Sequence, residues 1–230
     1  MAFEPSIAVF DACIPYPFHL RNVLVQVGVD RLVEARWTEA IHEEWIRSLL
    51  ADAPAIPTER LQGTRRLMEH ALPTAMVSGY EKHIPKITLP DPNDRHVVAA
   101  AITANAALIL TWNLRHFPAD ELGKFNLRAM TPDAFLSDLF DKIPRLLIDS
   151  LVRARRNLSK TRVSTSDFIG ILEKQELVQF AKRMERHASA LQVRRTLLID
   201  PSKQLQIPAS GRTILARYDP DAVATALAMS

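Results

Sequence analysis

Two short apolar runs in the chain each stop at polar residues. Residues 6–10 read SIAVF and are followed by Asp11, whereas residues 107–110 read ALIL and are followed by the triplet TWN at 111–113. Continuous apolar runs of this length are typical of strands that are buried on both faces of a parallel sheet. The pattern therefore predicts two buried strands, with polar side chains gathered at their carboxyl ends.

The segments around these runs alternate between helical and strand-like patterns. Ile41, Trp45 and Leu49 recur at the spacing of one helix face, which predicts a helix over 39–50 capped by Thr38. Further helices are predicted over 18–27 (ended by Gly28), 58–72 (capped by Thr58), 97–106, 118–122 and 131–140, and further strands within 31–37, 76–80 and 126–130. This alternation indicates an α/β fold in which right-handed crossovers place helices on both faces of a central parallel sheet.

The strand signals stop after Ile143. Residues 144–156 form a basic amphipathic pattern, and Ser164 or Ser166 opens a second predicted helix that runs to Leu191. We therefore divide the chain into an α/β domain (1–143), a basic helical extension (144–192) and a tail (193–230). The tail is net-neutral and apolar, so it is expected to dock on the rest of the protein.

The net charge of +3 is unevenly distributed over the 230 residues. Residues 1–144 carry −4, residues 145–195 carry +7 and residues 196–230 carry zero. An acidic first part and a basic second part would suit a nuclease, because carboxylates bind metal ions while a separate basic surface attracts phosphates. A basic helix that is simply solvated explains the same charges almost as well, so charge alone favours nucleic acid only slightly.

The composition fits a cytoplasmic protein. Cys13 is the single cysteine, which excludes an internal disulfide and fits a reducing compartment. The N-terminus lacks the basic and apolar regions of a signal peptide. The longest apolar stretch, 97–110, is shorter than the ~20 residues that span a bilayer, so no membrane association is expected.

Carboxylates stand at three places from which they could reach one site. Asp11 ends an apolar strand, where desolvation is costly unless another group compensates it. Asp91 and Asp94 stand at a helix start, where they fit a helix cap; alternatively, Asp94 points into the crevice at the strand ends. Glu44 lies at the edge of an apolar helix face, either inside the crevice or on the surface. The seven histidines have no cysteine partners, which disfavours a zinc site.

Four motifs follow one another along the first part of the chain. They are VFDAC (9–13), HEEWIRSLL (42–50), DPNDRHVVAAAI (91–102) and ILTWNLRHFP (109–118). In this order they resemble the motifs of the PIN-domain family, whose best-known members are the VapC-type toxins of bacterial toxin–antitoxin pairs. The resemblance covers residues 4–140 and implies a PIN-like nuclease domain over 1–143. It further implies a metal-dependent endoribonuclease that uses Mg²⁺ or Mn²⁺ and has an RNA substrate and a cognate antitoxin.

The resemblance also implies which acids bind the metal ion. Asp11 and Asp94 correspond to metal-binding acids of the family, and Asp91 is a supporting acid. Glu44, which positions the water or the metal ion, is preferred to Glu43, because the helix acid of the family directly precedes an apolar residue.

The chain departs from the family pattern at Asn113. The family motif T-x-D supplies a carboxylate at this position, whereas an asparagine offers a carbonyl oxygen without charge. The remaining acids would support one Mg²⁺ held largely through waters, and a two-metal site becomes doubtful.

Four arginines are candidates for RNA contacts. Arg21 resembles an arginine that the family often shows near the site, although a surface role is equally compatible with its position. Arg153, Arg155 and Arg156 cluster at the end of the first basic helix of the extension. The family resemblance does not cover the tail. Our hypothesis is that the tail resembles an antitoxin segment that packs on the nuclease domain, in cis or on a neighbouring copy; the alternative is a terminal segment that only completes the fold.

Asn113 also keeps two other functions open. One is a non-catalytic RNA- or protein-binding PIN module, and the other is a nuclease that acts on DNA. The sequence does not fix the oligomeric state, and a homodimer is compatible with it.

Overall fold

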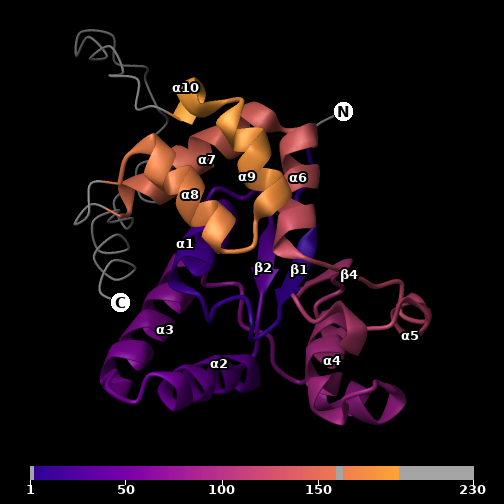
Figure 1. Cartoon of the computed structure of the whole chain (residues 1–230). Helices are drawn as coiled ribbons and strands as arrows, with labels where there is room; N and C mark the ends of the chain where they lie inside the picture. The colour runs from indigo at the N-terminus through magenta and orange to yellow at the C-terminus, as the bar shows by residue number, and fades with distance from the viewer. Residues whose placement is uncertain (1–2, 159–162, 192–230) are drawn as a thin grey trace, which may run out of the picture.

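A four-stranded parallel sheet lies at the centre of the computed structural model, which describes residues 3–158 and 163–191 (Figure 1). The strand order is β2-β1-β3-β4. In chain order, the strands are β1 (Ile7–Phe10), β2 (Glu34–Arg36), β3 (Leu108–Leu110) and β4 (Arg128–Met130). The two apolar runs of the sequence form the central pair, with Val9 opposite Ile109. Both are buried, as expected of inner strands covered on both faces.

One predicted strand is wrong. Within residues 76–80, only Met76 makes a sheet-like contact, an isolated parallel bridge with Trp37. Gly79 then adopts a left-handed conformation with φ 72°, and a 3₁₀ turn over Glu81–Lys86 follows directly. The backbone therefore turns away before a second pair of residues can join the ladder.

Helices cover the sheet and continue the chain beyond it. They are α1 (Phe18–Val29), α2 (Glu39–Asp52), α3 (Thr58–Ala71), α4 (Arg95–Thr103), α5 (Ala119–Gly123), α6 (Pro132–Lys142), α7 (Pro144–Arg156), α8 (Thr165–Lys174), α9 (Val178–Glu185) and α10 (Ala188–Leu191). In Figure 1, α2 and α3 lie on one side of the lower half and α4 on the other, whereas α6 to α10 gather at the upper end. The predicted α/β architecture is confirmed.

Local capping explains where several helices begin. The Thr38 hydroxyl accepts a hydrogen bond from the Ile41 amide at 3.2 Å, and Thr131 accepts one from Ala134 at 3.2 Å. Thr58 was expected to be a cap but is the first residue of α3, because Pro57 occupies the capping position.

Gly28 was expected to end the first helix, but α1 continues to Val29. The helix stops because Arg31 adopts φ 58° and the amides of Arg31 and Leu32 bond back to the last turn. A Cβ atom on Gly28 would lie 3.0 Å from a methyl group of Leu72. A larger residue at position 28 would therefore require the Leu72 side chain to shift by a few tenths of an ångström.

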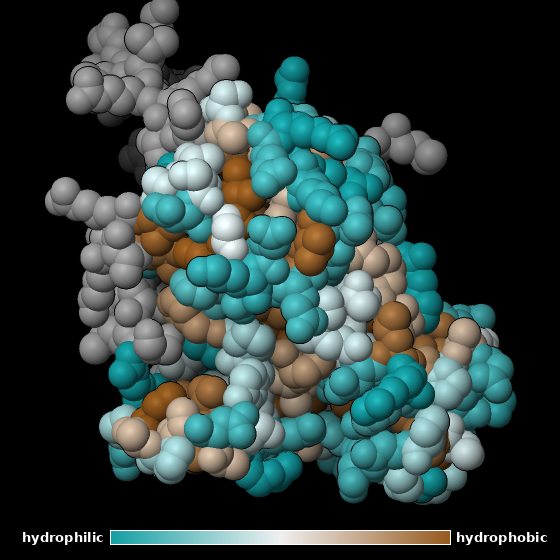
Figure 2. All heavy atoms as spheres, in the orientation of Figure 1, coloured by the Kyte–Doolittle hydropathy of each residue, from teal (hydrophilic) through white to brown (hydrophobic). Residues whose placement is uncertain are grey.

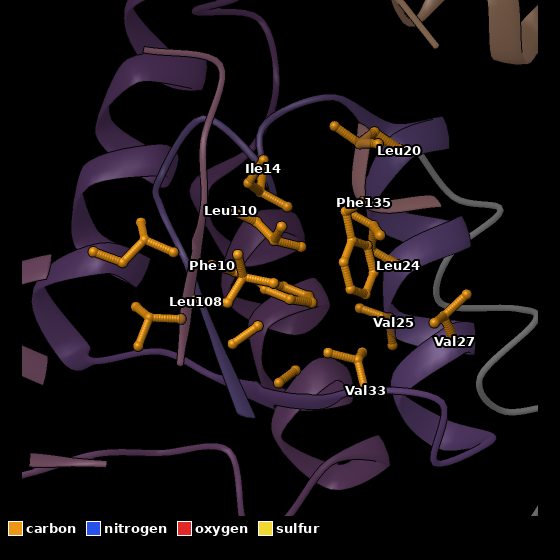
Figure 3. Close-up of a cluster of buried hydrophobic side chains, with 14 of the residues drawn as sticks. Phe10, Ile14, Leu20, Leu24, Val25, Val27, Val33, Leu108, Leu110 and Phe135 are labelled. Carbon is orange, nitrogen blue, oxygen red and sulfur yellow. The ribbon is translucent and has the colours of Figure 1, made fainter. Parts of the chain in front are cut away.

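The apolar core lies between the sheet and the helices that pack on it. Figure 3 shows Phe10, Leu110, Leu24 and Phe135 pointing into the same cluster. All four side chains are buried, and they come from β1, the end of β3, α1 and α6. Burial of such side chains stabilises the fold by about 1.5–3 kcal/mol each before the loss of conformational entropy.

The helices after α6 pack directly on the first domain. The buried Asn22 side chain of α1 donates to the Ala154 carbonyl of α7 at 2.8 Å, and Asn157 donates to both Asn22 and Gln26 at 3.1 Å. Asp133 at the start of α6 accepts from the Phe180 amide at 2.8 Å and so holds the start of α9. The division at residues 143 and 144 stays a prediction.

The single helix predicted from residue 164 or 166 to Leu191 is wrong, since this region forms three helices. Glu176 adopts φ 61°, which ends α8 and lets the chain turn into α9. Ser164 is the cap, because its hydroxyl accepts from the Asp167 amide at 3.1 Å. Hydrophilic residues dominate the visible surface over α6 and α9 (Figure 2).

The tail at 193–230 lies outside the described residues, so its predicted docking stays a prediction. Among the helices of 3–158 and 163–191, none combines the length and apolar character that crossing a membrane requires.

Candidate active site

The edge of the sheet where β1 and β3 end is the point at which the strand order reverses. β2 lies beside β1 on one side, whereas β3 and β4 lie on the other. Sites of open α/β sheets form at such a switch point, outside the carboxyl ends of the strands. Asp11 follows β1 there and Thr111 follows β3, and the Asp11 amide donates to the Leu110 carbonyl at 3.0 Å. The polar residues that follow the two strands therefore lie side by side at this edge of the sheet.

Asp11 is buried, with 4% of its surface exposed. Its carboxylate accepts hydrogen bonds from the Thr111 hydroxyl at 2.6 Å, the Ala12 amide at 2.7 Å and the Cys13 thiol at 3.3 Å. Burial raises the pKa of Asp11, these three hydrogen bonds oppose the rise, and the Glu44 carboxylate adds to it. The strand end thus holds a carboxylate that lacks a positive partner among the described residues.

A second set of side chains lies within electrostatic range of Asp11. Asp94 Oδ2 is 2.7 Å from His116 Nδ1, and ligand atoms of Asp91, Asp94 and His116 all lie within 4.8 Å of one another. Burial raises the pKa of Asp94, the His116 hydrogen bond lowers it, and the carboxylates of Asp11 and Asp91 raise it further. Asp91 also accepts from the Asn93 amide at 2.9 Å, so it caps the first turn as well.

His116 belongs to this set but was not predicted from the sequence. It lies in the 3₁₀ turn Leu114–His116 that follows β3, inside the motif ILTWNLRHFP. Its partner Asp94 is 22 positions earlier, and only the fold brings the two side chains together. A histidine just beyond a strand that ends at a site was the available signal, and sequence spacing alone did not select it.

Glu44 lies on the site side of α2, as the comparison with Glu43 predicts. Glu43 is exposed, whereas Glu44 is partly buried and its Oε2 lies 3.4 Å from His96 Nε2. Its carboxylate also acts on Asp11, because it raises the pKa of that residue. His96, at the start of α4, therefore links the helix acid to the helix that follows Asp94, and it too was missed in the sequence.

Asn113 stands next to the site with an exposed side chain. Its backbone amide donates to the Thr111 hydroxyl at 3.0 Å, and that hydroxyl in turn donates to Asp11. The residue therefore supports the site through its backbone. No hydrogen bond of its side-chain amide occurs within 3–158 and 163–191.

Arg21 does not lie where it could hold a phosphate. It is 1% exposed, its Nη1 donates to the Pro15 carbonyl at 2.6 Å, and its guanidinium lies 5.5 Å from the Trp45 ring centre and 5.7 Å from that of Phe18. Burial lowers the pKa of Arg21 to about 10. The carbonyl of Pro15 and the two aromatic rings thus hold the guanidinium between the start of α1 and α2, while its Nε is buried without a hydrogen-bond partner among the described residues.

The three arginines of α7 are in different situations. Arg153 pairs with Asp30 at 2.9 Å, and Arg155 donates to the carbonyls of Val163 at 2.9 Å and Leu191 at 3.3 Å. Arg156 is exposed, and no ion pair joins it to another described residue. Two of the three side chains therefore bind protein groups, and Arg156 alone of the three is open to a ligand in the part of the chain described.

The side chains at this edge fit a divalent metal ion. Asp11, Asp94 and Asp91 offer carboxylate oxygens, and His116 offers an imidazole nitrogen. Hard divalent cations prefer such oxygen-rich sets, with waters completing the shell. Burial and neighbouring carboxylates raise the pKa values of Asp11 and Asp94. A bound cation would lower these pKa values, because its positive charge stabilises the ionised carboxylates.

The fold and these carboxylates define a class: a PIN-like α/β domain with acids at the switch point of its parallel sheet. Residues 132–186 match the family model described as VapC50 C-terminal domain, which spans α6 to α9. No solved structure matches the chain.

A curated relative gives the more specific result. The chain is 34% identical over 120 residues to the protein named "Putative ribonuclease VapC50" of Mycobacterium tuberculosis (strain ATCC 25618 / H37Rv). The match covers 51% of this chain and 68% of that protein. The chain belongs to the VapC family of PIN-domain ribonucleases.

Proposed function

We propose that this protein is a Mg²⁺- or Mn²⁺-dependent endoribonuclease and the toxin of a toxin–antitoxin pair. The observation that carries the proposal is the convergence of Asp11, Asp94 and Glu44 at the switch point of a PIN-like sheet. The relative of this chain is named as a ribonuclease, which supports RNA as the substrate. A cognate antitoxin and a cytoplasmic location follow from the same family membership.

Asp11 and Asp94 are the proposed metal ligands, with Asp91 and His116 beside them. The metal ion, when bound, polarises the scissile phosphate and lowers the pKa of a bound water. Thr111 holds one oxygen of Asp11 through its hydroxyl at 2.6 Å and so fixes the orientation of the carboxylate. His116 holds Asp94 in the same way at 2.7 Å.

Glu44 is the proposed group that orients or deprotonates the attacking water. It is partly exposed and has His96 as its neighbour at 3.4 Å, so it can receive a proton that solvent then removes. A carboxylate is suited to this task because it can both accept a hydrogen bond from water and take its proton.

The test is a cleavage assay with the purified full chain. Labelled tRNA, mRNA and DNA are each incubated with Mg²⁺, with Mn²⁺ or with EDTA. Asp11→Asn and Asp94→Asn should abolish cleavage, and Glu44→Gln should reduce it by roughly 100-fold or more, the usual scale for loss of a general base. The matched controls are Glu43→Gln on the same helix and the exposed Asp138→Asn on α6, both of which should cleave like the unchanged chain.

Other outcomes would assign another function. Binding of RNA without cleavage, in either metal, would indicate the non-catalytic module that Asn113 in place of an aspartate suggests. Cleavage of DNA but not RNA would indicate a DNA nuclease. If Asp11→Asn cleaves RNA at the unchanged rate, the proposed site is wrong.

A further inference from the structure

A cavity of about 420 Å³ lies between the PIN-like domain and the turn that joins α8 to α9. Its volume is within the range of ~300–1,000 Å³ that is usual for small-ligand pockets. Residues from α2 and from the segments after β1 and β3 form one part of its wall. Lys174, Gln175 and Glu176, from the C-terminal helices, form the rest.

The cavity adjoins the proposed active site. Ala12 and Cys13, which line it, directly follow Asp11, and Cys13 donates to the Asp11 carboxylate at 3.3 Å. Glu44 also lines the cavity and lies close enough to Asp11 to raise its pKa. A ligand in the cavity would therefore sit next to the acids that are proposed to act on a phosphodiester.

Three aromatic side chains line the cavity: Tyr16, Trp45 and Trp112. Two of them are held in place, since the Trp45 indole donates to His42 Nδ1 at 2.9 Å and the Tyr16 hydroxyl donates to Asp52. Tyr16 and Trp112 are partly exposed and offer π faces on which a base can stack, whereas Trp45 is fully buried and its ring faces the Arg21 guanidinium. Each such contact changes affinity by roughly 5- to 150-fold.

The turn from the C-terminal helices adds polar groups to the wall. The side-chain oxygen Oε1 of Gln175 is buried and has no hydrogen-bond partner among the described residues. An amide in this state is suited to the edge of a base, which presents donors and acceptors. The exposed Lys174 beside it can attract the phosphate backbone. Glu176, which also lines the cavity, adopts the left-handed conformation of this turn with φ 61°.

We propose that this cavity is a nucleobase subsite, which takes the base of the nucleotide beside the scissile phosphate of RNA. The inference rests on the proposed ribonuclease function and gives it a recognition element. It also assigns a task to the C-terminal helices: they complete the wall that reads the base. The partly exposed aromatic side chains and the unpaired amide oxygen of Gln175 favour a base as the occupant of this cavity.

The first arm of the test measures binding without cleavage. Equilibrium dialysis of the full chain is carried out with AMP, CMP, GMP and UMP, and with ribose 5-phosphate, which lacks the base. At least one mononucleotide should bind roughly tenfold or more tightly than ribose 5-phosphate. Gln175→Ala and Trp112→Leu should bring this ratio towards one, whereas Trp112→Phe should retain it.

The matched controls are Gln179→Ala and Lys182→Ala, two exposed residues of α9 that do not line the cavity. Both should keep the ratio of the unchanged chain. Far-UV circular dichroism and the thermal midpoint of each variant show that a lost ratio does not come from a lost fold.

The second arm links the subsite to cleavage. The full chain is incubated with an RNA library of random sequence, and the ends of the products are sequenced. The unchanged chain should prefer a base at one position beside the cut, and Gln175→Ala should still cleave but with a preference reduced at least severalfold.

The two arms separate the two claims. If mononucleotides bind no more tightly than ribose 5-phosphate, or if Gln175→Ala keeps both the ratio and the preference, the subsite is wrong even if RNA is cleaved. If no RNA is cleaved but the base-dependent ratio exists and falls in Gln175→Ala, the subsite stands as a nucleotide site and the ribonuclease function fails.

Discussion

The Asp11 carboxylate is buried, and this burial lowers the free energy of unfolding of the metal-free protein when the carboxylate is charged. Its pKa is raised by burial, so its protonated form is favoured in the folded chain relative to the unfolded one. A group with a raised folded pKa contributes stability below its unfolded pKa, which is ~3.9 for aspartate, and loses that contribution as pH rises through the folded value. At neutral pH the Asp11 charge therefore lowers the stability of the metal-free fold.

The first prediction is that Asp11→Asn leaves the free energy of unfolding at pH 7 in EDTA unchanged or raises it. The asparagine removes the buried charge but keeps an oxygen that accepts from Thr111. Urea denaturation with Asp138→Asn as control measures the effect. A lower urea midpoint for Asp11→Asn would mean that the carboxylate stabilises the fold even without metal.

His42 gives a second prediction at the scale of one residue. It is fully buried, accepts from the Trp45 indole at 2.9 Å, and its pKa is lowered to about 4 by burial and by Arg65. The unfolded chain binds a proton near pH 6.5, whereas the folded chain does so only near pH 4. Stability should therefore fall as pH decreases from about 6.5 to about 4, by roughly 3 kcal/mol in total from this group.

The measurement is the urea midpoint of the chain and of His42→Gln between pH 7 and pH 4.5. Glutamine retains an acceptor for Trp45 but does not titrate, so the variant should lose less stability over this interval. Parallel curves for the two proteins would contradict the assignment.

Asn113 carries a third prediction. Its backbone amide donates to the Thr111 hydroxyl, which in turn donates to Asp11. A carboxylate at position 113 would therefore lie near the proposed metal site. Asn113→Asp should tighten Mn²⁺ binding severalfold in isothermal titration calorimetry, since it adds a charge to the ligand set. The control is Asn126→Asp. Asn126 lies before the N-terminal end of β4, away from the edge that carries the site, so this variant should bind Mn²⁺ as the unchanged chain does. Equal or weaker affinity in Asn113→Asp would place the side chain outside the site.

Among the elements, helix α7 carries three arginines that are close in sequence but have different surroundings. Arg155 joins α7 to two carbonyls and Arg153 pairs with Asp30, whereas Arg156 is exposed. Arg156→Ala should flatten the dependence of log K on log salt for single-stranded RNA by about 0.7, the contribution of one phosphate contact. Arg155→Ala should leave the slope nearly unchanged but destabilise the fold by roughly 1–3 kcal/mol, because buried carbonyls lose their donor.

Fluorescence anisotropy at several salt concentrations, with urea denaturation alongside, measures both effects. An unchanged slope in Arg156→Ala would mean that this end of α7 is only solvated or binds a protein. An altered slope in Arg155→Ala without loss of stability would mean that its carbonyl contacts are not maintained in solution.

At the scale of the whole molecule, the helical extension and the PIN-like domain share buried surface. Leu147 and Leu151 of α7 are fully buried, and the Asn22 side chain in α1 is satisfied by α7 and Asn157. A chain that ends after Ile143 should therefore lose cooperative unfolding or aggregate, since it would expose apolar side chains and leave Asn22 without its partners. A chain that ends after Leu191 should fold.

Circular dichroism and urea denaturation of the two truncated chains test this prediction. A stable product ending at Ile143 would show that the extension is an independent domain. For the tail, higher ribonuclease activity of the chain ending at Leu191 would support the inhibitory role predicted from the sequence. Failure of that chain to fold would show that the tail is structural.

The central features of this protein are predictable from the order of its residues. Continuous apolar runs predict the inner strands and helical periodicity predicts the helices, because these patterns reflect burial of a strand on both faces and of a helix on one. Polar residues directly after apolar strands predict where Asp11 and Thr111 lie, since parallel strands end at one edge. The capping role of Thr38 follows from the same local chemistry.

The partners of individual side chains, in contrast, are known only from the folded protein. The charge of Arg21 suggests an exposed side chain, but the guanidinium is enclosed by Pro15, Phe18 and Trp45. His116 meets Asp94 across 22 positions, and the left-handed Glu176 breaks a helix that periodicity continues. These outcomes depend on desolvation and packing between distant segments, which have no signature in a local pattern.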